Sequence, residues 1–237
     1  FPTFYKPNQN PTRSFIDFFG EEADTTIFIR DFAPQADRGR FDTDLLPYID
    51  KALAASRGKL LVVLHTYGSH FNYYDRYPRS LARFTPDGHV EATRGNRPSL
   101  LNAYDNSILV TDSLLAGVID RLEATGKTAA MIYTSDHGED IFDDSRRLFL
   151  HASPCPSYYQ IHVPFLVWFS SRYRSAYPQT VANAVVNRGK FVASSQAYFH
   201  TLMEIAGLRS PRVNALRSLV NPSYTPEPPR YLNDHNE

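Results

Sequence analysis

Four ionisable residues gather within five positions of the segment YTSDHGED, which runs from Tyr133 to Asp140. They are Asp136, His137, Glu139 and Asp140, and they follow directly on the apolar run 128–132. Carboxylates this close together repel one another unless a cation or a proton offsets their charge. A bound metal ion is therefore the first explanation to consider.

Further histidines occur where other apolar runs end. LLVVLHTYGSH supplies His65 and His70, and LFLHASP supplies His151. The carboxyl ends of parallel strands lie along one edge of a sheet, so these turns could meet there. Imidazole nitrogens with carboxylate oxygens suit zinc or manganese better than calcium. The alternative is structural: a histidine beside a strand is more often a hydrogen-bonded structural residue, and Asp136 could cap a following turn.

Hydrophobic periodicity predicts strands that alternate with helices. Strands are expected at 25–30, 59–66, 128–134 and 162–170, and helices at 42–55, 98–126 and 194–206. The strand runs are almost continuously apolar, which favours strands covered on both faces. The order predicts an α/β sandwich with a largely parallel central sheet flanked by helices.

Composition narrows the possible partners and the domain organisation. Twenty-five basic and 25 acidic residues balance, so nucleic acid is not expected as a partner and any recognition of anions must be local. Cys155 is the only cysteine, which excludes an internal disulfide framework. No linker divides residues 1–208, so they are expected to form one domain. Residues 209–237 are rich in Pro and Asn, and a partly ordered surface tail is expected there.

Five motifs in a fixed order resemble a known family. VVLHTYGSHFNYYDRYP, NAYDNSILVTD, YTSDHGED, LFLHASP and HVPFLVWFS look like the catalytic domain of the bacterial phosphoethanolamine transferases, within the alkaline-phosphatase and sulfatase superfamily. The similarity runs from about residue 1 to residue 208. GSH followed by YYDRYP is the more specific part, because many members of the superfamily share SDHGE. The resemblance implies an alkaline-phosphatase/sulfatase-like sandwich.

The resemblance also implies roles for individual residues. Asp136 and His137 match the Asp-His pair that binds the catalytic zinc in this family. His70 and His151 match histidines that bind phosphate or hold a second zinc, so one or two zinc ions are expected and no organic cofactor. Glu139 is expected to orient His137 or its loop.

The implied reaction is a zinc-dependent transfer between two envelope lipids. Phosphatidylethanolamine is the expected donor, lipid A or another envelope glycan the acceptor, and a phospho-threonine the intermediate. The expected location is the bacterial inner membrane, with this domain in the periplasm and the membrane reached through segments absent from this chain. The threonine and a glutamate ligand belong N-terminal to the motifs, so we expect this chain alone to show no turnover.

Two other functions remain open from the sequence. One is a sulfatase or phosphohydrolase of the same superfamily, with water as the acceptor. The other is an inactive, metal-free binding domain. SPCPSYY resembles a sulfatase nucleophile motif, but the stretch that begins at Cys155 lacks the spacer residue and the arginine. Cys155 is therefore expected to be a small loop residue.

Overall fold

A computed structural model describes residues 3–7, 20–27, 41–151 and 156–227, which form two compact units. The first unit ends at Arg121 and the second begins at Leu122, within the last turn of the longest helix. Cys155, and the part of the expected strand 25–30 beyond Ile27, lie outside the described residues. No helix in the described ranges is long and apolar enough to cross a membrane.

The first unit contains a parallel sheet in the order β2-β1-β3, formed by β1 (Thr3–Pro7), β2 (Thr25–Thr26) and β3 (Leu61–His65). β1 pairs with β3 from Thr3↔Leu61 to Pro7↔His65. Tyr5 is 6% exposed. This parallel pairing confirms the α/β class that the apolar runs predicted.

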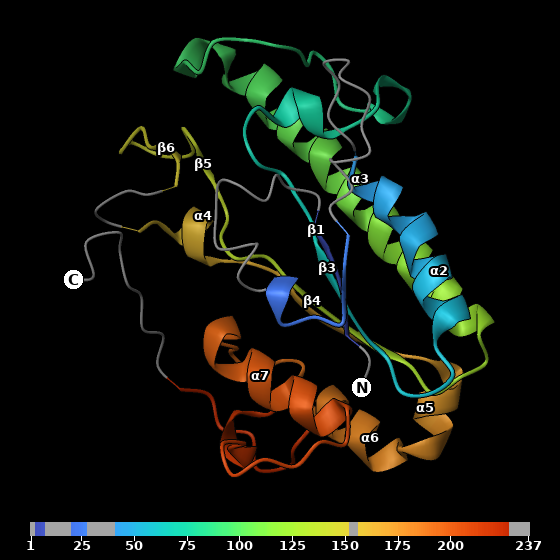
Figure 1. Ribbon diagram of the computed structural model, residues 1–237. Coiled ribbons are helices and arrows are strands. Elements are labelled where there is room, and N and C mark those ends of the chain that lie inside the picture. The colour runs from blue at the N-terminus through green and yellow to red at the C-terminus, as the bar shows by residue number, and fades with distance from the viewer. Residues whose placement is uncertain (1–2, 8–19, 28–40, 152–155, 228–237) are drawn as a thin grey trace. The chain divides into compact units, whose positions relative to one another are not determined.

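Two helices pack together in the first unit, with short 3-10 helices at their ends and in the connecting loops (Figure 1). They are α2 (Leu46–Ala55) and α3 (Arg97–Ala124), and the 3-10 helices are η3 (Asp42–Leu45), η4 (Tyr73–Arg76), η5 (Arg79–Leu81) and η6 (Arg94–Asn96). A Cβ atom at Gly117 would lie 2.8 Å from Leu46 Cδ1, so a glycine allows the helices to approach closely. Arg121 Nε lies 2.9 Å from Asp50 Oδ1 across the same interface.

The second unit is built on an antiparallel pair of strands, β4 (Ala130–Thr134) and β7 (Phe165–Phe169). This pairing differs from the parallel arrangement expected for these two strands. Between them lie the hairpin of β5 (Asp140–Ile141) and β6 (Phe149–Leu150) and the one-turn helix α4 (Tyr158–Ile161). The described residues between the two strands contain no long helix of the kind that usually forms a parallel crossover.

Three helices follow β7 and carry the core of the second unit. They are α5 (Ser171–Ala176), α6 (Pro178–Asn187) and α7 (Ser194–Ile205), followed by the 3-10 helix η7 (Ala215–Arg217). Phe169, Tyr173 and Val220 are buried together. Gly207 ends α7 with a φ of 66°, a left-handed conformation that suits glycine.

The chain after residue 208 packs more closely than expected for a surface tail. Leu219, Val220 and Tyr224 are 7%, 4% and 5% exposed. The Nδ2 atom of Asn187 donates to the carbonyl of Leu219 at 2.9 Å, and Thr201 Oγ1 accepts from the Leu219 amide at 3.0 Å. Residues 219–224 are therefore packed into the second unit, where the sequence led us to expect a surface course. The domain boundary at residue 208 stays a prediction.

Candidate metal centre

The loop after β4 forms a tight turn held by its own side chains. Ser135 Oγ donates to the carbonyl of His137 at 2.7 Å. Asp136 Oδ1 accepts from the His137 backbone amide at 3.0 Å. These two bonds fix the backbone that carries the Asp-His pair at the end of a strand.

Helix α4 fixes the next part of this loop from the other side. The Gly138 amide donates to the carbonyl of Gln160 at 2.7 Å. A Cβ atom at position 138 would lie 2.1 Å from the backbone oxygen of Tyr159, so only glycine fits. Gln160 Nε2 also donates to Asp140 Oδ2 at 2.5 Å, and Asp140 is only 1% exposed. The buried hydrogen bond between Gln160 and Asp140 therefore holds α4 against the loop.

The β5–β6 hairpin returns the chain to the same place. Asp140 pairs with Leu150 and Ile141 with Phe149, so the residue before β5 and the residue after β6 lie side by side. These flanking residues are Glu139 and His151. Glu139 Oε1 lies 3.0 Å from His151 Nδ1.

Three side chains converge at this point and could hold a metal ion. The ligand atoms of His137, Glu139 and His151 lie within 4.8 Å of one another. The two imidazole rings have centroids 3.8 Å apart. The Glu139 side chain is 5% exposed, whereas those of His137 and His151 are 34% and 37% exposed. A buried carboxylate thus underlies two imidazoles that reach solvent.

The geometry of Asp136 and His137 suits zinc. His137 Nδ1 lies 2.9 Å from the carbonyl of Gly138, where it can donate a proton and leave the Nε2 lone pair for a ligand role. His137 Nε2 lies 3.7 Å from Asp136 Oδ2. Two ligand atoms bound tetrahedrally at about 2.1 Å from one zinc lie about 3.4 Å apart. The donor chemistry and the spacing therefore fit this ion.

The structure brings together His137, Glu139 and His151, with Asp136 beside His137. The roles assigned to Asp136, His137 and His151 stay predictions. Glu139 was expected to orient His137 or the loop, and the structure places its Oε1 atom 3.0 Å from His151 Nδ1. Asp140 and Gln160 were given no role from the sequence. Asp140 stands in the quoted motif, but no sequence signal pairs it with a glutamine 20 residues away.

His70 belongs to a separate loop in the first unit, which is held by a buried carboxylate. Asp42 is 6% exposed, and its two oxygens accept from the amides of Tyr67 and Gly68 at 2.9 and 2.8 Å. The His70 ring lies edge-on to Tyr67, with centroids 5.1 Å apart. Arg76 Nε donates to the His70 carbonyl at 3.0 Å. The role of His70 in phosphate binding stays a prediction.

The α/β architecture and the cluster of histidines and carboxylates define a chain of the alkaline-phosphatase and sulfatase type. The Sulfatase family model matches residues 2–208. The chain therefore belongs to the sulfatase family.

Curated relatives are phosphoethanolamine transferases of bacteria. The Kdo(2)-lipid A phosphoethanolamine 7''-transferase of Salmonella typhimurium is 39% identical over 136 residues. This match covers 56% of the chain and 23% of the Salmonella protein, so the chain spans less than a quarter of that relative's length.

Solved structures of related proteins match the fold of this chain over part of their own length. The C-terminal periplasmic domain of EcEptC from Escherichia coli matches with a TM-score of 0.85 and 25% identity, covering 100% of this chain and 66% of that one. The same domain in complex with Zn matches with a TM-score of 0.77 and 24% identity, covering 96% and 64% of the two chains. The sulfatase-like fold predicted from the motifs is confirmed.

Proposed function

We propose that the chain forms the metal-binding part of an enzyme that transfers phosphoethanolamine from phosphatidylethanolamine to lipid A or another envelope glycan. The cluster of His137, Glu139 and His151 carries this proposal, because converging imidazole and carboxylate ligands can hold a zinc ion, which stabilises charge on phosphoryl oxygens. The relatives named as phosphoethanolamine transferases favour transfer over hydrolysis. The proposed location is the periplasmic side of the bacterial inner membrane, in line with the solved periplasmic domain.

Asp136 and His137 would hold one zinc ion, and His151 would face the phosphoryl group or a second zinc ion. The solved Zn complex of a related domain supports this choice of metal. Zinc supplies positive charge that stabilises phosphoryl oxygens and lowers the pKa of a hydroxyl nucleophile. Glu139 would orient the imidazole of His151 through their contact at 3.0 Å.

The proposed transfer has two steps. A threonine hydroxyl loses its proton and its oxygen bonds to the phosphorus of the donor, while the diacylglycerol oxygen leaves with the bonding electrons and takes up a proton. An acceptor hydroxyl then loses its proton and its oxygen bonds to the same phosphorus, while the threonine oxygen leaves with the bonding electrons and takes up a proton. We assign the threonine to none of the described residues.

The test is a transfer assay on the complete protein that the gene encodes. His137→Ala should lower transfer of phosphoethanolamine from phosphatidylethanolamine to lipid A by at least about a hundredfold, because several kcal/mol of charge stabilisation are lost. His89→Ala, in the first unit, is the matched control and should retain activity. Mass spectrometry of lipid A reports transfer, and free phosphoethanolamine reports hydrolysis. Full transfer by His137→Ala, or release of free phosphoethanolamine with no modified lipid A, would contradict the proposal.

A further inference from the structure

An exposed loop of the first unit combines apolar and basic side chains. Residues 79–86, with the sequence RSLARFTP, include two arginines and no acidic residue, and we call them the 79–86 loop. Leu81 and Phe84 are 37% and 41% exposed. The backbone amide of Arg83 is hydrogen-bonded, but its side chain has no partner in the part of the chain that the structure describes.

Helix α3 holds the backbone of this loop. Asn106 is 0% exposed, and its Oδ1 accepts from the amides of Arg83 and Phe84 at 2.8 and 3.0 Å. Its Nδ2 donates to the carbonyl of Phe84 at 2.9 Å. Asn102 Nδ2 donates to the carbonyl of Pro86 at 2.8 Å. Two asparagines of one helix thus fix a loop whose apolar side chains stay outside the core.

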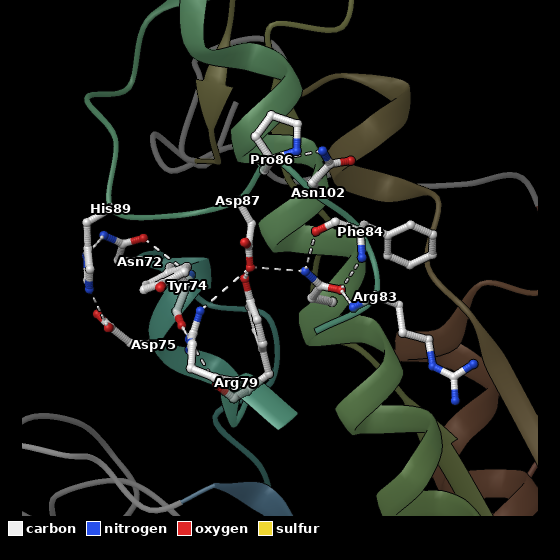
Figure 2. Close-up of polar contacts among 12 residues, drawn as sticks. Asn72, Tyr74, Asp75, Arg79, Arg83, Phe84, Pro86, Asp87, His89 and Asn102 are labelled. Carbon is white, nitrogen blue, oxygen red and sulfur yellow. Dashed lines mark hydrogen bonds and ion pairs between the residues drawn. The ribbon is translucent and has the colours of Figure 1, made fainter. Parts of the chain in front are cut away.

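The two arginines of the loop have different surroundings. The Arg79 guanidinium lies over the rings of Tyr74 and Tyr77, 3.3 and 4.2 Å from their centroids, and 3.7 Å from Asp87. Figure 2 shows the side chains of Arg83 and Phe84 directed away from this polar network. Arg79 therefore anchors the loop, and Arg83 remains as a cation that faces solvent.

The loop follows His70 closely in the same unit. Arg76, the last residue of η4, binds the His70 carbonyl, and η5 begins three residues later. A fixed backbone with exposed apolar side chains, and an arginine whose side chain has no partner among the described residues, suits the interface of a lipid bilayer. The apolar groups can enter the boundary between headgroups and acyl chains, while the guanidinium stays at the phosphates.

We propose that the 79–86 loop docks on a bilayer that contains anionic lipid. Leu81 and Phe84 enter the interface, and Arg83 pairs with lipid phosphate. Docking would hold the His70 loop at the membrane. The proposal rests on the proposed function only because that function has a lipid as the phosphoethanolamine donor. Docking itself needs no metal, so it can be tested without zinc.

The test is co-sedimentation of the 237-residue chain with vesicles in the presence of a metal chelator. Vesicles of phosphatidylcholine with about one third phosphatidylglycerol should bind the chain better than phosphatidylcholine alone, and high salt should weaken this binding. Leu81→Ser/Phe84→Ser and Arg83→Glu should each lower partitioning by about tenfold. Unchanged melting temperatures would show that both variants fold.

A matched control removes exposed apolar side chains from the second unit. Val185 and Val186 on α6 are 58% and 73% exposed, more than either apolar residue of the 79–86 loop. Val185→Ser/Val186→Ser should bind vesicles as the unmodified chain does. Absence of vesicle binding, full binding by the loop variants, or an equal loss in the α6 control would overturn the proposal. None of these results bears on the zinc site, which the chelator leaves empty.

Discussion

Each unit contains a histidine-carboxylate pair with the same spacing, but the two pairs have different surroundings. In the second unit, His151 lies 3.0 Å from Glu139, whose side chain is 5% exposed. In the first unit, His89 lies 3.0 Å from Asp75, whose side chain is 49% exposed (Figure 2). The pair distance therefore cannot by itself distinguish a candidate metal site.

The surroundings of the imidazoles make the distinction. Both ring nitrogens of His89 are occupied, because Nε2 faces Asp75 and Nδ1 lies 3.0 Å from the Asn72 amide nitrogen. The His151 ring instead lies tilted against the His137 ring, with centroids 3.8 Å apart, so two imidazoles and a buried carboxylate converge. A metal ion needs several ligand atoms that converge, and the β5–β6 hairpin of the second unit brings Glu139 and His151 together for this.

Substitution of Gly138 should give the largest effect, and in the second unit alone. Gly138→Ala places a Cβ atom 2.1 Å from the Tyr159 backbone oxygen, so the loop and α4 must separate. We expect a loss of about 3 kcal/mol or more in the free energy of unfolding. Denaturant unfolding measures the loss of stability, and zinc titration measures the weaker zinc binding expected when the ligand loop moves. Gly95→Ala is the control, because nothing lies closer than 3.9 Å to its Cβ position. Wild-type zinc affinity and stability in Gly138→Ala would refute the close fit.

Substitution of Asn106 should weaken the first unit and leave the metal site intact. Asn106→Ala removes the acceptor for two loop amides and the donor to the Phe84 carbonyl. The unmet backbone groups should lower stability by about 2 to 3 kcal/mol. Chemical unfolding gives the stability and calorimetry the zinc affinity. A matching loss of zinc affinity would show that the two regions are not independent.

Substitution of Asp140, which forms a buried pair with Gln160, should have a smaller effect. A second substitution that exchanges the two groups should rescue it. Asp140→Asn weakens the contact with Gln160 Nε2 and should lower zinc affinity by about tenfold, because this pair positions the ligand loop. Asp140→Asn with Gln160→Glu restores one carboxylate and one amide with their roles exchanged. Zinc titration of both variants is the measurement. The double variant should recover affinity, and failure to do so would argue against the pair as the support.

Removal of the Tyr77 hydroxyl should give the smallest effect, and this effect should fade at high pH. Burial, with the hydrogen bond to Asp87, raises the pKa of Tyr77 to about 12. The unfolded tyrosine ionises near 10, so its contribution to stability is complete below about pH 10 and is lost as pH rises toward 12. Tyr77→Phe should cost about 1 kcal/mol at neutral pH and show a shallower alkaline loss. Identical alkaline unfolding curves for both proteins would contradict this.

Periodicity predicted the long elements because their apolar residues recur on one face. The helix expected at 98–126 is α3, and the strand expected at 128–134 contains β4. β1 gave no such signal, because its Lys6 is charged yet 2% exposed, and its burial lowers the pKa of the ammonium. β5 and β6 are two residues long, and Phe142 and Leu150 have positive φ values that no apolar pattern encodes.

The close contacts of the site were predictable only where motif residues stand together in sequence. Asp136 and His137 are adjacent, so their proximity follows from the chain itself. His151 was assigned to the site from its place after an apolar run and from the motif resemblance, but its contact with Glu139 depends on a hairpin that the sequence did not predict. The antiparallel return of β7 was missed because an apolar run has no direction.

Zinc titration of the 237-residue chain tests the central claim most directly. The chain should bind zinc, and His137→Ala should weaken binding by about a hundredfold, with a smaller loss, about tenfold, for His151→Ala. His89→Ala removes the histidine that pairs with Asp75 at the same 3.0 Å distance, and this variant should bind zinc as the unmodified chain does. Zinc binding that is as tight in His137→Ala as in the unmodified chain, or that is lost in His89→Ala, would contradict the account.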